Sequence, residues 1–302
     1  MNPHRFPASR LGLDRSIELG MAVRRRRPES PRGTLVYIHG LGESGLCFES
    51  VMCDPRLDAW DHLAIDLIGY GRSVWGEQPL GLEQHAASIE LVLDRLGIDR
   101  AVLLGHSMGS VIAVILAERG RITVDAVLDI EGNVTLDDCT FSGQAAAMST
   151  EKWCRAGYGD FLLNMHVMAN EGEKAAENGD DSKERAPVMR AYAASCHYAD
   201  PRTFHLDAVD LVQASGAEEL AARRSALSAP VTYFYGASRG TGEKSLGQLK
   251  DAGIPCLAFE PAGHWLFLDQ PAAFIDSMVE ALDAVPAPAG AEGVEEKVEV
   301  GE

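Results

Sequence analysis

Residues 101–119 read AVLLGHSMGSVIAVILAER, and this stretch decides the fold of the chain. The apolar run Ala101–Gly105 predicts a buried strand, and the apolar run Ser107–Glu118 predicts a helix. Between them lies the pattern G-x-S-x-G. A serine presented at the tip of a strand needs a strained turn, in which side chains at the two glycine positions would collide with neighbouring backbone. The stretch therefore predicts that Ser107 is a catalytic nucleophile rather than part of an ordinary tight turn.

Strand and helix patterns alternate on both sides of this stretch. Further apolar runs that predict strands are Thr34–His39, His62–Asp66, Val124–Ile130, Val231–Tyr235 and Pro255–Phe259. Helical patterns stand between or after them at Leu82–Leu96, Glu243–Asp251 and Ala272–Ala284. Apolar strands that alternate with amphipathic helices are typical of a parallel sheet covered on both faces. We therefore expect an α/β protein with a mostly parallel central sheet flanked by helices.

The pattern changes within residues 133–224, where strand signals stop. Helical stretches such as Lys152–Ala169 and Ala186–Cys196 take over, and the charged stretch Glu171–Arg185 predicts a mobile surface loop. A helical insertion within an α/β sheet predicts a cap over the site. Apolar cap residues expected to form its roof are Trp153, Phe161, Met165 and Met168.

These shifts in composition predict three parts of the chain. Residues 1–132 and 225–284 should form the core, and residues 133–224 the helical cap or lid. Residues 285–302 begin with Pro and Ala and then carry five glutamates against one lysine, so we expect a disordered acidic tail.

The charge balance indicates which partners the chain can have. Its 302 residues carry a formal net charge of −18, and no long basic stripe offsets it. Repulsion therefore makes nucleic acid and anionic membrane surfaces poor partners, and a small-molecule substrate is expected instead. The one basic run, Arg24–Arg27, predicts a solvated strand end or turn.

Targeting signals and cysteine spacing point to the cytoplasm. Residues Met1–Arg10 lack the apolar stretch of a secretory signal, and no run approaches the roughly 18 apolar residues of a membrane span. The six cysteines show neither C-x-x-C nor metal-like spacing, so they read as reduced thiols. We expect a cytoplasmic protein without metal or organic cofactor.

Three motifs together resemble the α/β-hydrolase superfamily, over nearly the whole chain. They are the G-x-S-x-G at Ser107, the His39-Gly40-Leu41 turn that follows a strand, and the Asp66–Ser73 loop, which is similar to D-x-x-G-x-G-x-S. The resemblance implies an α/β-hydrolase fold with an inserted helical cap. It also implies an oxyanion hole made by the backbone amides of Leu41 and Met108. His39 and the Asp66–Ser73 loop are expected to be structural.

The resemblance also implies a general base. Members of the family carry their triad in the order serine, acid, histidine. Among nine histidines, only His264 stands late in the chain, after the last predicted strand and in the turn Gly263-His264-Trp265. We expect His264 to be the base.

The triad acid departs from the commonest family pattern. Most members carry an Asp soon after the strand that is Val231–Tyr235 here, but this chain continues GASRGTGE, with no carboxylate before Glu243. A known variant of the family pattern places the acid one strand earlier. At the corresponding place in this chain, Glu131 stands at the end of an apolar strand, 24 residues after Ser107. We expect Glu131 to be the acid, with Glu243, Asp129 or no acid at all as alternatives, and with a solvent-facing strand end as its non-catalytic interpretation.

These residues together favour acyl transfer. We expect a serine hydrolase that cleaves an ester, thioester or lactone of a small apolar substrate through an acyl-enzyme. The relocated acid and the large cap keep open an alternative on the same fold, a C–C bond hydrolase or a non-hydrolytic lyase, dehydratase or cyclase. A catalytically silent ligand-binding module is the alternative from another class.

Overall fold

The centre of the protein is an eight-stranded sheet in the order β1-β2-β4-β3-β5-β6-β7-β8. The computed structural model describes residues 12–177 and 185–285. Strands β3 to β8 run parallel to one another, while β2 pairs antiparallel with both β1 and β4 at one edge. The strands are β1 (Asp14–Glu18), β2 (Met21–Arg26), β3 (Thr34–Ile38), β4 (Asp61–Ile65), β5 (Arg100–His106), β6 (Thr123–Ile130), β7 (Val231–Gly236) and β8 (Cys256–Phe259).

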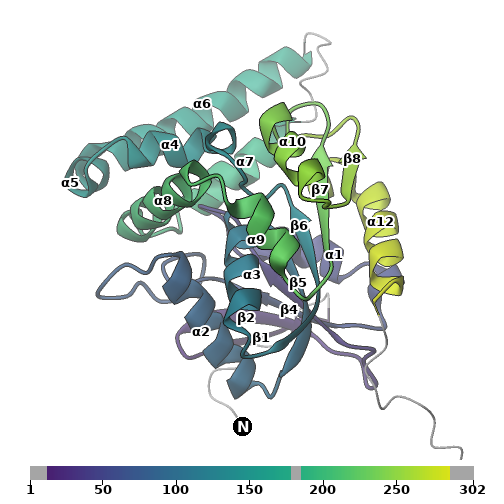
Figure 1. Cartoon of the computed structure of the whole chain (residues 1–302). Helices are drawn as coiled ribbons and strands as arrows, with labels where there is room; N and C mark the ends of the chain where they lie inside the picture. Colours follow the sequence, from purple (N-terminus) through teal and green to yellow (C-terminus); the bar gives the residue numbers. More distant parts are fainter. Residues whose placement is uncertain (1–11, 178–184, 286–302) are drawn as a thin grey trace, which may run out of the picture.

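Helices cover both faces of this sheet, because successive side chains of a buried strand point to opposite sides. In β3, Leu35 and Tyr37 belong to one apolar core, which they share with Phe48 and helix α12 (Pro271–Asp283). Val36 and Ile38 belong to the other core, with helices α2 (Leu82–Arg95) and α3 (Met108–Arg119). Figure 1 shows α2, α3 and α9 (Leu220–Ala226) on one side and α12 at the other. The predicted α/β fold is confirmed.

The helices keep the order of an α/β chain with one long helical insertion. They are α1 (Glu49–Met52), α2 (Leu82–Arg95), α3 (Met108–Arg119), α4 (Thr140–Ala146), α5 (Thr150–Lys152), α6 (Tyr158–Glu177), α7 (Arg185–Cys196), α8 (Pro201–Gly216), α9 (Leu220–Ala226), α10 (Glu243–Asp251), α11 (Leu266–Asp269) and α12 (Pro271–Asp283). A π-helical turn, Trp153–Gly157, joins α5 to α6.

Helices α4 to α8 form a layer beyond the sheet, at the top of Figure 1. Aromatic rings hold this layer together: Trp153 stacks on Phe204 with ring centroids 5.5 Å apart, and Phe161 contacts both rings. The loop prediction for residues 171–185 is partly wrong, because α6 continues to Glu177. Residues 178–184 and the predicted acidic tail from 286 lie outside the described residues. The core and cap boundaries stay a prediction, and the one at 224 falls inside α9.

The basic run Arg24–Arg27 corrects another expectation, since its first residues are not solvated. They belong to β2, and Arg24 is 4% exposed, with ion pairs to Asp66 and Glu49. Arg25 makes two hydrogen bonds to Asp61, at 2.9 and 2.5 Å. Strand β2, which lies between β1 and β4, is therefore ion-paired along this run, whereas the sequence pattern predicted a solvated strand end or turn.

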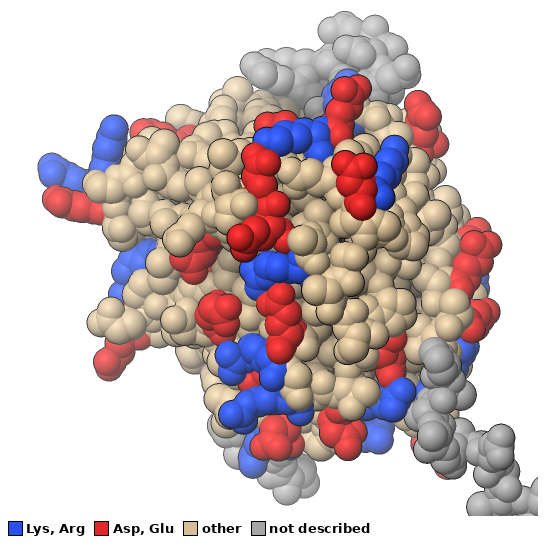
Figure 2. All heavy atoms as spheres, in the orientation of Figure 1, with Lys and Arg blue, Asp and Glu red and all other residues tan. Residues whose placement is uncertain are grey.

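Charged side chains of both signs are interspersed over the face shown in Figure 2, without a broad basic area. All six cysteines are free thiols, as predicted. Across residues 12–177 and 185–285, no helix is both long and apolar enough to cross a membrane.

Candidate active site

Ser107 lies in the turn between β5 and α3, in a conformation that only a constrained backbone adopts. Its φ is 52° and its ψ is −118°, and its N–H donates to the carbonyl of Ile130 at 2.8 Å. A Cβ on Gly105 would collide with the backbone of Ser110, and a Cβ on Gly109 with the carbonyl of Ile38. The two glycines are thus needed for close approach, as the pattern predicts.

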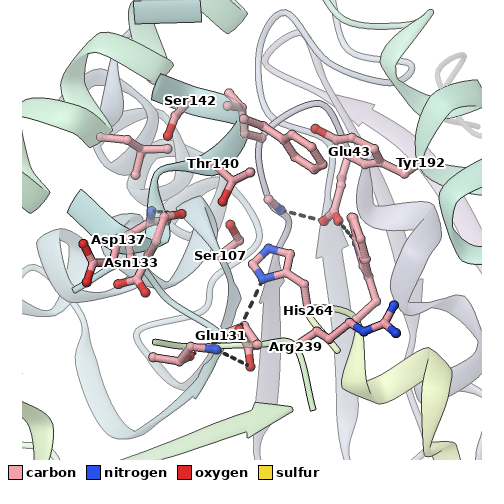
Figure 3. Close-up of a pocket in the computed structure, with 18 of the residues that line it drawn as sticks. Glu43, Ser107, Glu131, Asn133, Asp137, Thr140, Ser142, Tyr192, Arg239 and His264 are labelled. Atoms are coloured by element: carbon pink, nitrogen blue, oxygen red, sulfur yellow. Dashed lines mark hydrogen bonds and ion pairs between the residues drawn. The ribbon is translucent and has the colours of Figure 1, made fainter. Parts of the chain in front are cut away.

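Glu131 and His264 meet in the same pocket as Ser107. The Glu131 side chain is 2% exposed, and its Oε2 lies 3.3 Å from Nδ1 of His264. Both residues line the pocket together with Ser107, whose hydroxyl and the His264 ring point into it in Figure 3. Residues that stand 133 positions apart in the chain are therefore brought into contact at the carboxyl ends of β5, β6 and β8.

The backbone around Glu131 is built to hold its carboxylate. Glu131 has a φ of 54°, and its N–H donates to the carbonyl of Phe234 on β7. Its Oε1 accepts hydrogen bonds from the N–H groups of Gly236 at 2.6 Å and Thr241 at 3.3 Å. A Cβ on Gly240 would overlap Oε1. The last residue of β7 and the loop that follows it therefore supply N–H donors to the Glu131 carboxylate. That loop carries no carboxylate itself.

The alternative acids are engaged or placed elsewhere. Asp129 is fully buried and forms an ion pair with Arg224 of α9 at 2.5 Å, while its other oxygen accepts the N–H of Gly132. Glu243 is an exposed residue at the start of α10. Neither belongs to the pocket lining.

The predicted oxyanion donors flank Ser107. Leu41 lines the pocket, and Met108 is the first residue of α3, where a helix has N–H groups without an intrahelical acceptor. His39 holds the adjacent backbone: its Nε2 accepts the Leu67 N–H at 3.0 Å, so Nδ1 carries the proton and donates to the Gly40 carbonyl. Burial lowers the pKa of His39, in keeping with this neutral form.

A second buried cluster, beside Ser107, Glu131 and His264, was not predicted from the sequence. Glu43 Oε2 accepts from Nδ1 of His106 at 2.9 Å and from the N–H of Gly40 at 2.8 Å. Its Oε1 accepts from the indole N–H of Trp265 at 2.5 Å, and His106 Nε2 lies 2.9 Å from the His264 carbonyl oxygen. The one sequence signal for this cluster is its place in the motifs, since Glu43 follows the His39-Gly40-Leu41 turn and His106 lies within G-x-S-x-G. Their contact joins residues 63 positions apart, so no local pattern predicts it.

This contact shifts both pKa values. Burial alone would raise the pKa of Glu43, but the charge of His106 and the hydrogen bonds from His106, Trp265 and Gly40 lower it to about 2. Burial likewise opposes protonation of His106, but the charge and hydrogen bond of Glu43 raise its pKa overall. The two groups therefore form a buried ion pair one residue away from Ser107.

The pocket has a volume of about 620 Å³ and two kinds of wall. Its apolar lining is Leu41, Phe141, Met168, Met189, Tyr192, Leu211 and Trp265. The predicted roof is therefore wrong except for Met168, since Trp153, Phe161 and Met165 are buried inside the cap layer. Its polar side includes Asp137, Thr140 and Arg239. Among the described residues, no three His, Cys, Asp or Glu side chains group closely enough to hold a metal ion.

Known proteins resemble this chain in sequence. A family model described as "Alpha/beta hydrolase family" matches residues 35–277. The chain is 30% identical to lipase LipV of Mycobacterium tuberculosis over 39% of its own length and 44% of that protein. For most curated relatives, it spans about half of their length or less. One that matches more fully is 2-succinyl-6-hydroxy-2,4-cyclohexadiene-1-carboxylate synthase of Serratia proteamaculans, 29% identical over 82% of this chain and 91% of the relative.

Solved structures show the same fold at low sequence identity. A thermophilic esterase from Thermogutta terrifontis superposes with a TM-score of 0.70 and 18% identity, over 90% of this chain and 94% of the esterase.

Proposed function

Since the chain belongs to the α/β hydrolase family, we propose that it is a serine hydrolase that cleaves an ester, thioester or lactone bond through an acyl-enzyme. The observation that carries this proposal is the contact of Glu131 with His264 in the pocket that also exposes Ser107. A nucleophile, a base and a group that orients the base make up the set needed for acyl transfer.

The proposed reaction begins with attack of the Ser107 hydroxyl on the carbonyl carbon. His264 accepts the serine proton at Nε2, because Nδ1 faces Glu131. The Glu131 carboxylate then stabilises the imidazolium and keeps its ring oriented. The amides of Leu41 and Met108 donate to the oxyanion of the tetrahedral intermediate. His264 returns the proton to the leaving oxygen or sulfur, and water, activated by the same histidine, releases the acid.

The pocket supports a small and mainly apolar acyl or alcohol group. Cap side chains from α4, α6, α7 and α8 contribute Phe141, Met168, Met189, Tyr192 and Leu211 to its wall. A volume of about 620 Å³ falls within the range of small-molecule sites. The six free thiols support action in a reducing compartment such as the cytosol.

The test is reaction of Ser107 with a fluorophosphonate, followed by mass spectrometry, together with turnover of short p-nitrophenyl esters. We expect Ser107→Ala to abolish labelling and to lower kcat by more than about 1,000-fold. Ser88→Ala, which removes a partly exposed hydroxyl on α2 outside the pocket lining, is the matched control and should label like the unaltered protein. An unlabelled Ser107, or ester turnover that persists in Ser107→Ala, would refute the proposal.

A second candidate is a non-hydrolytic reaction or C–C bond cleavage on the same residues. It is favoured by the relative matched over most of its length, whose name is that of a synthase. Rapid labelling of Ser107 without turnover of any ester, thioester or lactone would favour this candidate over the hydrolase.

A further inference from the structure

The cluster of Glu43, His106 and Trp265 links three loops that meet at Ser107. Glu43 follows the His39-Gly40-Leu41 turn, His106 immediately precedes Ser107, and Trp265 immediately follows His264. Glu43 and His106 are 4% and 0% exposed, so their contacts do not compete with bulk water. Figure 3 shows Glu43 on the side of the pocket opposite Asp137 and Asn133.

The hydrogen-bond partners of His106 determine its protonation state. Its Nδ1 faces a Glu43 oxygen at 2.9 Å, and that oxygen already accepts the Gly40 N–H. Its Nε2 faces the carbonyl oxygen of His264 at 2.9 Å, which can only accept. In a neutral imidazole, one ring nitrogen would carry a lone pair that faces an acceptor oxygen, so one of these two hydrogen bonds could not form. Both nitrogens therefore carry protons, and His106 is an imidazolium.

The groups around this imidazolium are few and come from separate elements. Glu43 is its direct counter-ion, and Glu131 at the end of β6 adds a more distant negative charge. The His264 ring lies 4.7 Å away between ring centroids, and Phe267 of α11 packs edge-on at 5.1 Å. The Cys47 thiol lies 3.8 Å from the Glu43 oxygen that faces His106.

We propose that the Glu43–His106 ion pair is a positioning unit, which fixes the main chain of His264 and the Gly40–Leu41 turn relative to Ser107. This inference rests on the proposed function. His106 bonds the carbonyl oxygen of His264, and Glu43 accepts the indole N–H of the next residue, Trp265. Glu43 also accepts the N–H of Gly40 in the predicted oxyanion turn. The proposed base, His264, and the proposed oxyanion turn are thus both held in place by one buried ion pair.

The pair also connects the site to the cap. The Trp265 ring, held by Glu43, lies 5.1 Å from the ring of Tyr192 on α7, and both line the pocket. A substrate that contacts Tyr192 therefore touches a ring that packs against Trp265, whose indole N–H is bonded to Glu43.

The kinetic test is Glu43→Gln, which removes the charge and keeps the size of the side chain. Loss of geometry by about 1 Å can lower kcat about 100-fold, and we expect a fall of this order with KM changed less than about threefold. The rate of fluorophosphonate labelling should fall in parallel. The matched control is Glu90→Gln, because Glu90 is also buried and bonded to Arg119 at 2.8 Å, away from the pocket. Equal kcat values in the two variants would overturn the proposal.

A spectroscopic test needs no altered protein. In protein with 15N-labelled histidine, both ring nitrogens of His106 should report the protonated form at pH 6.5, where an ordinary histidine is only half protonated. His106→Gln identifies the signals. A neutral His106 in the unaltered protein would refute the inference even where Glu43→Gln does not fold. Failure of the proposed function is distinct, because the unaltered protein would then not react with the fluorophosphonate, whatever the charge of His106.

Discussion

At the scale of single residues, the site depends on two side chains in left-handed backbone. Ser107 has a φ of 52° and Glu131 a φ of 54°, and such a conformation costs a non-glycine residue about 1–3 kcal/mol. Each is held by an N–H donated to the neighbouring strand, from Ser107 to Ile130 and from Glu131 to Phe234. The sheet therefore imposes the orientation of both side chains.

Replacement of Glu131 by Gln should lower kcat and leave KM nearly unchanged. The charge that stabilises the imidazolium is lost while the side-chain size remains, so a fall of about 100- to 10,000-fold is expected in steady-state ester turnover. Glu243→Gln changes an exposed carboxylate outside the pocket and should stay within about twofold of the unaltered protein. Full turnover in Glu131→Gln would mean that another residue serves as the acid.

Gly240→Ala tests the packing around the same carboxylate. The added Cβ would overlap Glu131 Oε1 and push it from His264, so we expect at least about a tenfold loss of kcat. Gly247→Ala is the control, since nothing lies within 4 Å of its Cβ and it stands within α10. That change should raise the free energy of unfolding by up to about 1 kcal/mol. The measurements are kcat for ester turnover and the free energy of unfolding in urea for both variants. A fully active Gly240→Ala would show that the loop can move away and leave Glu131 in place.

At the scale of elements, β6 carries charged groups with different tasks. Glu131 at its end faces the pocket, while Asp129 inside the strand pairs with Arg224 of α9. Asp129 and Arg224 are both fully buried, so the pair joins α9 to the sheet without solvent. Breaking a buried pair leaves one charge without a partner, which is more damaging than loss of an exposed pair.

Asp129→Asn should therefore destabilise the protein by about 3–5 kcal/mol. Asp125→Asn, at the start of the same strand, removes a partly exposed pair with Arg100 and should cost no more than about 1 kcal/mol. Urea unfolding followed by circular dichroism measures both values. Similar midpoints for the two variants would contradict the importance of the Asp129–Arg224 pair.

The elements also show which parts of the structure local patterns can predict. Strand β5, the turn at Ser107 and helix α3 were predictable because glycine spacing and apolar runs are local signals. The contact of Glu131 with His264 could be predicted only because no carboxylate follows β7 before Glu243. The Glu43–His106 contact was not, since it depends on the pairing of β3 with β5. Strand β2 was missed because its arginines are polar in sequence but neutralised by distant acids.

At the scale of the whole molecule, the chain combines a net charge of −18 with several buried carboxylates that lie against basic side chains, such as Glu43, Asp66 and Asp129. Glu43 is the clearest example, because its ion pair with His106 lowers its pKa to about 2 although burial acts in the opposite direction. A carboxylate whose pKa is depressed in the folded state contributes stability above its ordinary pKa. That contribution is lost as the pH falls toward the folded value.

Acid should therefore destabilise the unaltered protein more steeply than Glu43→Gln. A pKa lowered from 4.5 to about 2 corresponds to about 3 kcal/mol of unfolding free energy, lost between pH 5 and pH 2. Glu43→Gln begins less stable at pH 5 but lacks this loss, so the two curves should converge. Urea unfolding at pH steps across this range measures the slopes. Parallel curves would show that Glu43 titrates normally.

The loop between β7 and α10 has a consequence for engineering. This loop and the last residue of β7 contact Glu131 through the N–H of Gly236, the N–H and hydroxyl of Thr241 and the close approach of Gly240, while Ala237, Ser238 and Arg239 are exposed. A library diversified at those three exposed positions, of which Arg239 lines the pocket, would alter the pocket wall without replacing Glu131. A chimera that received this segment from a relative with an aspartate after β7 would instead bring two carboxylates to one histidine. Recombination among members of the family should therefore exchange β6 and this loop together.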